Sequence, residues 1–213
     1  MDFEHVLELV GDEPVFESSL LLAGKVDPAN IQLQLARWTK SGRVYQLRRG
    51  LYAFAPPYQK VKPHPFVIAN RVSRASYVSC QSALAFYGLI PEYVPATTSV
   101  TTHRPGRWET PLGVFDFRHI QFNLLRGYRM IDLGNEQRAF IATPEKALLD
   151  LVYLQPKSDS LAYMRELRLQ NLERLNLDGL RGQVEVFNTP KLQRAAAIIA
   201  SLAQTETLEY ETL

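Results

Sequence analysis

The sequence predicts an α+β protein built from two domains of unequal size. Three observations lead to this prediction: short capped helical segments open the chain, two β-prone runs joined through a glycine follow them, and helical and strand-like patterns interleave after a proline-rich connector. With 213 residues, of which 46% are hydrophobic, the chain is long enough to form more than one core.

Three short helices are expected at the start of the chain. Apolar residues recur at helical spacing over residues 3–10, behind an aspartate that can cap them. A second helix is expected over residues 17–23. A third begins at Asp27 and Pro28, where aspartate is a favourable cap and proline suits the first helical position, and it ends at Ser41 and Gly42.

A basic hairpin is predicted after the third helix. Two β-prone runs, residues 43–47 and 51–55, flank Arg48, Arg49 and Gly50, and the glycine supplies the turn geometry. Three helices followed by such a hairpin are typical of a winged helix-turn-helix. Four prolines between residues 56 and 65 then keep the chain extended. We therefore expect a winged helix-turn-helix over residues 1–58 and a larger mixed α/β domain over residues 64–213.

The second domain is expected to mix helices and strands. In the helix that begins at Thr143 and Pro144, residues Ala147, Leu148 and Leu151 are spaced to face a core. The part after residue 160 is expected to be helical. The other predicted elements are helices over residues 65–72 and 79–87, strands over residues 97–102, 128–133 and 138–142, and a hairpin-like pair over residues 107–110 and 114–120.

Positive and negative charges are segregated along the chain, although its net charge is only +2. Residues 28–91 contain no aspartate or glutamate, whereas residues 1–27 hold seven acids and a single base. Such a block is typical of a surface that binds a polyanion, most of all nucleic acid, and charge alone also fits a solvated basic face. The basic residues of the block are Arg37, Lys40, Arg43, Arg48, Arg49, Lys60, Lys62, Arg71 and Arg74.

The third helix and the hairpin hold the candidate DNA contacts. Asparagine and glutamine can pair with the edge of adenine and arginine with that of guanine, so a polar helix stripe suits the major groove. The arginines of the hairpin suit phosphates or the minor groove. Alternatively, the stripe is the exposed face of an amphipathic helix. Leu33, off the apolar stripe, could be a contact, but we expect it to be a partly buried neighbour. The predicted contacts are Asn30, Gln34, Arg37, Lys40, Ser41, Arg43, Arg48 and Arg49.

Two further sets of residues are weaker candidates for contacts with nucleic acid. The aromatic residues Tyr45, Tyr52 and Phe54 can stack on single-stranded bases, but in a two-stranded wing we expect them to pack on the helices beneath. A second nucleic-acid surface is predicted from His103, Arg104 and Arg107. Neighbouring acids at residues 92, 109 and 116 can equally balance it.

The sequence predicts neither a metal nor a cofactor, and it does not predict an enzyme. Its four histidines lack the spacing of metal ligands, and Cys80 has no second thiol nearby, so we expect it to be a small buried hydrophobic residue. The glycines do not form a phosphate-binding loop. A magnesium nuclease is the enzymatic alternative, because four carboxylates could gather: Asp116, Asp132, Glu145 and Asp150. A simpler hypothesis pairs Glu145 with Lys146 in a first helical turn.

The compartment expected for this chain is the cytoplasm. One cysteine excludes an intramolecular disulfide, and the first residues lack the charge and apolar pattern of a signal peptide. The longest apolar stretches are well short of the roughly 20 residues that cross a bilayer, so no membrane span is expected.

Most of the chain resembles the AbiEi family of antitoxins from type IV toxin-antitoxin systems, and the match weakens after about residue 160. The ordered set of motifs carries this resemblance, since the wing motif alone occurs in many winged-helix proteins. The motifs are LRRGLYA at residues 47–53, YVSCQSAL at 77–84, YGLIPE at 87–92, TSVTT at 98–102 with Arg104 and Pro105, ETPLG at 109–113 and ATPEKALLD at 142–150.

The resemblance implies a repressor that binds its own promoter, usually at inverted repeats, and counteracts a co-encoded nucleotidyltransferase-like toxin without a stable complex. Carried over to this sequence, DNA binding falls on the polar stripe and on Arg48 and Arg49. A monomer or a weak dimer on DNA is expected. Because one winged domain reads only a short site, two copies are expected to act together, by dimerisation or by cooperative occupation of repeats. The alternatives are a stand-alone regulator without a toxin, a nucleic-acid-processing enzyme with a winged targeting domain, and a protein-interaction module.

Overall fold

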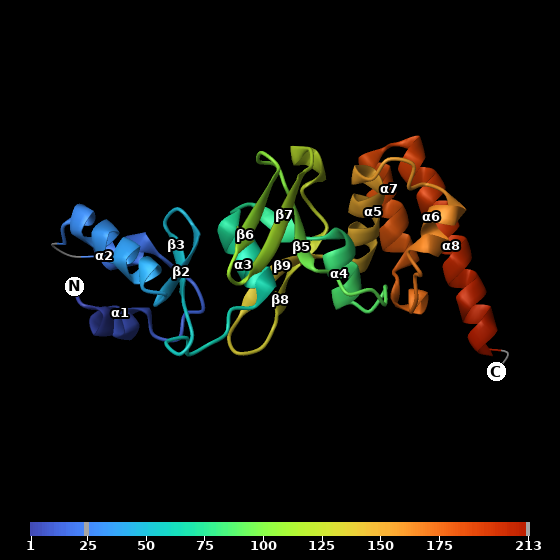
Figure 1. The fold of residues 1–213 in the computed structure, drawn as a ribbon. Helices are drawn as coiled ribbons and strands as arrows, with labels where there is room; N and C mark the ends of the chain where they lie inside the picture. Colours follow the sequence, from blue (N-terminus) through green and yellow to red (C-terminus); the bar gives the residue numbers. More distant parts are fainter. Residues whose placement is uncertain (24–25, 212–213) are drawn as a thin grey trace.

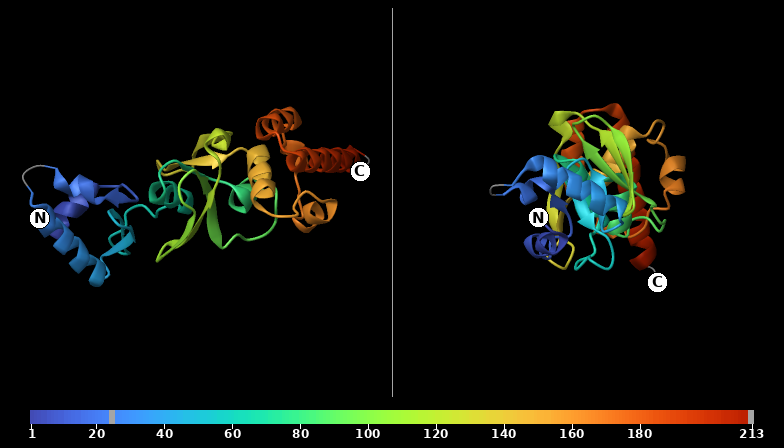
Figure 2. Two further views of the ribbon diagram at one scale, coloured as in Figure 1. Left: turned by 90° about the horizontal axis from the view of Figure 1, so that it is seen from above. Right: turned by 60° about the vertical axis from the view of Figure 1, so that its left-hand side comes forward.

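The structure is a computed structural model that describes residues 1–23 and 26–211, with side chains up to residue 205. It is a mixed α+β protein arranged in three parts in a row (Figure 1). A small N-terminal module lies at one end, a six-stranded sheet in the middle and a group of helices at the other end. The left view in Figure 2 agrees with this order, and the two termini lie at opposite ends.

The N-terminal module, residues 1–58, contains the expected first and third helices. The carboxylate of Asp2 accepts a hydrogen bond from the His5 amide at 2.9 Å, and that of Asp27 accepts one from the Ala29 amide at 3.0 Å. Both predicted caps are therefore confirmed. The elements in chain order are α1 (Phe3–Val10), β1 (Phe16–Glu17), the 3-10 helix η1 (Ser18–Leu22), α2 (Pro28–Lys40), β2 (Val44–Arg48) and β3 (Leu51–Phe54).

One segment of the module differs from the prediction. Where a helix over residues 17–23 was expected, a two-residue strand, β1, precedes the 3-10 helix η1. β1 pairs with β3, and the sheet order is β1-β3-β2. The amide of Ser18 donates to the carbonyl of Gly50 at 2.9 Å. Two residues are too few for an alternating pattern, so this pairing leaves no local signal in the sequence.

The predicted hairpin is present as β2 and β3. Gly50 has φ +79°, a conformation that a residue with a side chain adopts only at a cost, and this explains the glycine in the turn. β3 is buried on both faces. Tyr52 and Phe54 join an aromatic core inside the module, whereas Leu51 and Ala53 join the large core that continues into the rest of the chain. The hairpin is thus packed between the helices of the module and the middle of the molecule.

Residues 55–64 form no helix or strand, as expected of the proline-rich connector. The predicted domain limits, 1–58 and 64–213, lie near the two ends of this segment. α3 (Pro65–Val72) begins directly after it and has the bounds that the sequence predicts.

The middle of the molecule is a six-stranded mixed sheet with the order β6-β7-β5-β4-β9-β8. Each predicted strand is found within about a residue or two of its expected limits. β4 was not predicted, because its three residues are buried on both faces and show no alternation. The strands are β4 (Ser76–Val78), β5 (Ala96–Thr101), β6 (Gly106–Thr110), β7 (Gly113–His119), β8 (Tyr128–Asp132) and β9 (Arg138–Ala142).

Helices cover the sheet on both sides. α3 lies on the side of the N-terminal module, and α4 (Cys80–Phe86) and α5 (Pro144–Leu154) lie on the side of the C-terminal helices (Figure 1). The residues Ala147, Leu148 and Leu151 are buried, as predicted. The remaining helical elements are η2 (Phe122–Leu124), α6 (Leu161–Glu166), η3 (Leu172–Arg174), α7 (Leu177–Phe187) and α8 (Pro190–Glu211). In the part of the chain that the structure describes, no helix is long and apolar enough to span a membrane.

Candidate nucleic-acid interface

The outward face of α2 carries most of the predicted contacts. Its apolar residues Ile31, Leu35 and Trp38 are buried, as the spacing predicts. The direction opposite this core falls on Leu33, Arg37 and Lys40, which recur at i, i+4 and i+7. Leu33 is 51% exposed, so the expectation that it is partly buried was wrong.

The other predicted residues of α2 lie beside this outward face. Asn30 and Ser41 are exposed, and Gln34 is half-buried because it lies between the outward face and the core. The hydroxyl of Ser41 donates to the carbonyl of Trp38 at 3.2 Å, so it helps to close the helix. A face centred on Leu33, Arg37 and Lys40 is therefore broader and less polar than the predicted stripe.

The arginines of the hairpin have different surroundings. Arg49 is exposed in the turn, and the guanidinium of Arg43 lies 5.1 Å from the ring centre of Phe3 while the residue remains exposed. Arg48 is turned toward the middle of the molecule. Its Nε and Nη2 atoms both donate to the carbonyl of Arg71 at 3.3 Å. Arg48 thus ties the hairpin to α3.

Acidic residues from the first part of the chain form ion pairs with residues of the basic block. Glu17 receives two hydrogen bonds from Arg74, at 2.5 and 2.7 Å, and lies 3.8 Å from Arg48. The hydrogen bond from Arg74 holds the pKa of Glu17 below its ordinary value. Asp12 lies 3.5 Å from Lys60. The fold therefore partly neutralises a block that contains no acid in the sequence.

Four basic residues of the N-terminal module keep their charge uncompensated. Within the described ranges 1–23 and 26–211, none of them forms an ion pair with a carboxylate. All four are exposed and come from the end of α2 and from the hairpin beside it. These residues are Arg37, Lys40, Arg43 and Arg49. They make up the candidate interface, together with Asn30, Leu33 and Ser41.

The aromatic side chains of the hairpin pack in the cores and do not form an exposed surface for bases. Tyr52 is 8% and Phe54 is 5% exposed, and their rings lie 5.9 and 5.1 Å from that of Phe16. Tyr45 is partly buried and packs on the larger core. The preference for packing over stacking on bases is confirmed.

The predicted second surface lies at the β6 edge of the large sheet. His103 and Arg104 are exposed in the turn between β5 and β6. Arg107, in β6, lies 3.2 Å from Glu109 and 3.9 Å from Asp116. Its charge is balanced by these neighbours, whereas His103 and Arg104 form no ion pair with a carboxylate among the described residues.

The four carboxylates that could have gathered around magnesium do not converge. Asp116 lies near Arg107, Asp132 lies 3.9 Å from Arg138, and Glu145 accepts a hydrogen bond from the Asn176 amide at 2.8 Å. Across the described residues, no group of three or more histidine, cysteine or acidic side chains could hold a metal ion.

A buried polar network lies where the sequence suggested a simple charge pair in the first turn of a helix. The Nζ atom of Lys146 donates to Asp150, so the expected pairing with Glu145 was wrong. Asp150 also accepts from the hydroxyls of Tyr77 at 3.0 Å and Ser79 at 2.7 Å. All four side chains are fully buried.

Burial governs the ionisation of this network. It lowers the pKa of Lys146 and raises the pKa values of Asp150 and Tyr77. Cys80, at the start of α4, is also buried, which raises its pKa and agrees with its predicted character as a small hydrophobe. Since these groups have no contact with solvent, they join α5 to β4 rather than form an open site.

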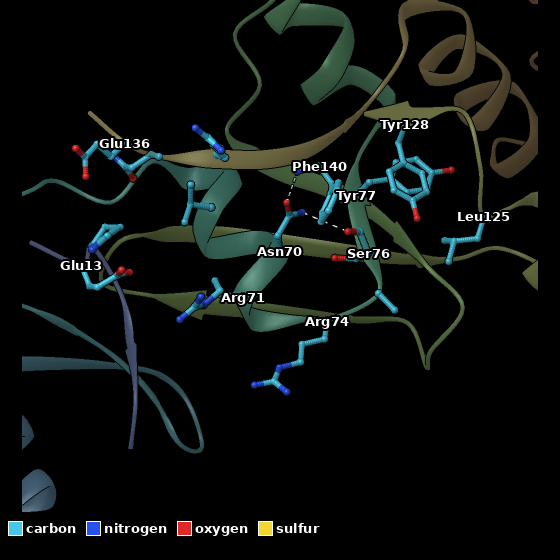
Figure 3. Close-up of a pocket in the computed structure, with 15 residues that line it drawn as sticks. Glu13, Asn70, Arg71, Arg74, Ser76, Tyr77, Leu125, Tyr128, Glu136 and Phe140 are labelled. Atoms are coloured by element: carbon cyan, nitrogen blue, oxygen red, sulfur yellow. Dashed lines mark hydrogen bonds between the residues drawn. The ribbon is translucent and has the colours of Figure 1, made fainter. Parts of the chain in front are cut away.

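A cavity of about 540 Å³ opens between the N-terminal module and the large sheet. β4 and β9 pair at a single position, Val78 with Ile141, and diverge beyond it. Asn70 bridges the gap: it donates to the carbonyl of Ser76 at 3.4 Å and accepts from the Phe140 amide at 2.6 Å (Figure 3). This cavity was not predicted, because its walls come from residues far apart in the chain.

The cavity contains both charged and aromatic walls. The ring of Tyr128 stacks on that of Tyr77 with centres 4.5 Å apart. Figure 3 shows Glu13 and Glu136 at one end, Tyr128 and Leu125 at the other, and Arg71 and Arg74 along one side.

The chain matches no family model, and no curated protein was found to be similar to it in sequence.

Proposed function

We propose that this protein is a cytoplasmic DNA-binding repressor of the antitoxin type, in which the N-terminal module is a winged helix-turn-helix that binds the promoter of its own gene. The uncompensated basic side chains of α2 and the hairpin support this proposal most strongly. Positive charge without counter-charge on one module is what a phosphate backbone attracts.

The arrangement of the module also supports the proposal. The second of its two α-helices, α2, has a capped N-terminus and an exposed face, and a basic hairpin follows it. In a winged helix-turn-helix the exposed helix enters the major groove, where Asn30 and Arg37 would read base edges. The hairpin residues Arg43 and Arg49 would contact phosphates or the minor groove. Arg48 would act by holding the hairpin to α3.

The remaining part of the proposal concerns a toxin. The resemblance of the chain to AbiEi antitoxins supports a role for residues 64–213 in counteracting a nucleotidyltransferase-like toxin. Co-expression of the full chain with a nucleotidyltransferase encoded beside its gene should restore growth that the toxin alone arrests. Persistent arrest with the full chain present would contradict this role.

DNA binding is tested by fluorescence anisotropy on the duplex upstream of the gene, at several salt concentrations. The logarithm of affinity should fall with that of salt with a slope of about −0.9 per phosphate neutralised. Replacing Arg37 and Arg49 by alanine should weaken binding and reduce the magnitude of the slope by about 1 for each lost phosphate contact.

A matched control separates this interface from general charge. Arg181 is an exposed arginine of α7 that pairs with Asp178 at 3.1 Å, far from the N-terminal module (Figure 1). The Arg181→Ala variant should bind like the wild type. Equal loss in both variants, or equal weak binding to a scrambled duplex, would show that the basic face of α2 is solvated and carries no DNA-binding function.

A further inference from the structure

The cavity between the N-terminal module and the large sheet is lined by three separate parts of the chain. Glu13 and Pro14 come from the module, Arg71 from the end of α3 with Arg74 just after it, and Tyr128 from β8. Its volume of about 540 Å³ is within the usual range of about 300–1,000 Å³ for small-molecule sites. A molecule bound here would contact the module and the middle of the molecule at once.

Arginine side chains supply the cationic side of this cavity. Arg71 is exposed, and among the described residues it has no carboxylate within ion-pair distance. Arg74 lies two residues beyond the end of α3, and its guanidinium holds Glu17. Two guanidinium groups along the same side of the cavity are suited to bind a phosphate group through several hydrogen bonds.

Aromatic side chains supply the apolar end. One face of the Tyr128 ring is covered by Tyr77, and the residue is 38% exposed. Phe140 meets the ring of Tyr128 edge to face at 5.6 Å and is 39% exposed. A planar base can therefore extend the stack of Tyr77 and Tyr128 from the open side.

The acids at the far end limit the length of the ligand. Glu13 and Glu136 line the cavity beyond the arginines in the view of Figure 3. Their negative charge would repel a polynucleotide that continued past a single phosphate. The arrangement fits one phosphate and one aromatic ring, and no longer polyanion.

We propose that this cavity binds a nucleoside 5′-monophosphate, with the phosphate on Arg71 and Arg74 and the base on Tyr128. Because phosphate competes with the Glu17 carboxylate for Arg74, binding loosens the contact between the N-terminal module and α3. The effect of this loosening on DNA binding rests on the proposed function. Ligand binding itself does not, because it is measured without DNA.

Isothermal titration calorimetry of the full chain with AMP and with GMP tests the proposal. Adenosine lacks the phosphate and ribose 5-phosphate lacks the base. The affinity of each should be lower than that of AMP by a factor of at least about ten. Arg71→Gln should weaken AMP binding about tenfold, and Arg107→Gln, an exposed arginine at the other edge of the sheet, should leave it unchanged. Glu17→Gln should tighten binding, because it frees Arg74.

Three outcomes would overturn the proposal. No heat of binding with AMP or GMP at millimolar concentration removes the ligand class. Ribose 5-phosphate that binds as well as AMP removes the aromatic contact. Unchanged AMP affinity in Glu17→Gln, with circular dichroism confirming the fold, removes the competition for Arg74.

Discussion

At the scale of single residues, His64 is a cap that depends on protonation. Its Nδ1 atom accepts a hydrogen bond from the Phe66 amide at 3.1 Å, at the start of α3. A ring nitrogen can accept only when it carries no proton. Burial lowers the pKa of His64, which favours the neutral ring that the cap requires.

We therefore predict that lowering the pH decreases the free energy of unfolding, because His64 becomes protonated. With a folded pKa below the unfolded one, its contribution is complete above the unfolded value of about 6.5 and is lost as pH falls through the folded pKa. The loss should be about 1 kcal/mol, the usual contribution of a cap.

Urea unfolding at about pH 7.5 and about pH 5 checks this prediction. His64→Asn keeps an accepting side chain that does not titrate, so this variant should lose less stability between the two pH values than the wild type does. The same pH dependence in both proteins would contradict the role of His64.

The buried network makes a second prediction at this scale. In Asp150→Asn, the ammonium group of Lys146 would lose its anionic partner inside the core. Removing one partner of a buried pair costs about 3–5 kcal/mol, and we expect a loss of that size in the free energy of unfolding. Urea denaturation measures it.

A double variant is the control for this second prediction. Lys146→Met combined with Asp150→Asn leaves no unpaired charge, so it should lose less stability than Asp150→Asn alone. Equal losses in the single and double variants would mean that the pairing of charge contributes nothing.

At the scale of secondary-structure elements, Asn70 replaces a missing stretch of sheet. Its amide joins the carbonyl of Ser76 in β4 to the amide of Phe140 in β9, where the two strands have diverged. Because Asn70→Ala leaves two backbone groups without these partners, we expect a loss of about 1–3 kcal/mol.

Thermal or urea unfolding of Asn70→Ala measures this loss. Asn123→Ala is a suitable control, since Asn123 is exposed in η2 and should change stability by less than about 0.5 kcal/mol. An Asn70→Ala protein as stable as this control would show that solvent replaces the bridge.

At the scale of the whole molecule, the N-terminal module shares its hairpin with the middle of the chain. Four of its residues lie in the large core rather than in the aromatic core of the module: Val15, Leu47, Leu51 and Ala53. A fragment of residues 1–58 would expose them. We expect this fragment to self-associate or to unfold at lower urea concentration than the full chain.

Size-exclusion chromatography and circular dichroism of the fragment test this expectation, with the full chain at the same concentration as control. A monomeric fragment that unfolds at the same urea concentration as the full chain would show that the module is stable without its neighbour.

Elements whose signals are local could be predicted from the amino-acid sequence. α2 begins behind Asp27, α3 has its predicted limits, and the hairpin turns at Gly50, because caps, proline and glycine act on the few residues around them. The same signals placed the apolar stripe of α2 and the outward direction of its basic residues.

The pairing of residues that are distant in the sequence could be seen only in the folded chain. β1 and β4 are strands because partners far along the chain complete their hydrogen bonds, and Arg48 turns inward because α3 offers it a carbonyl. Lys146 is buried because Asp150, Tyr77 and Ser79 surround the charge pair. The physical reason is the same for each of these contacts. The partner of a side chain is the group that lies near it in space, and the spacing of residues along the chain does not identify that group.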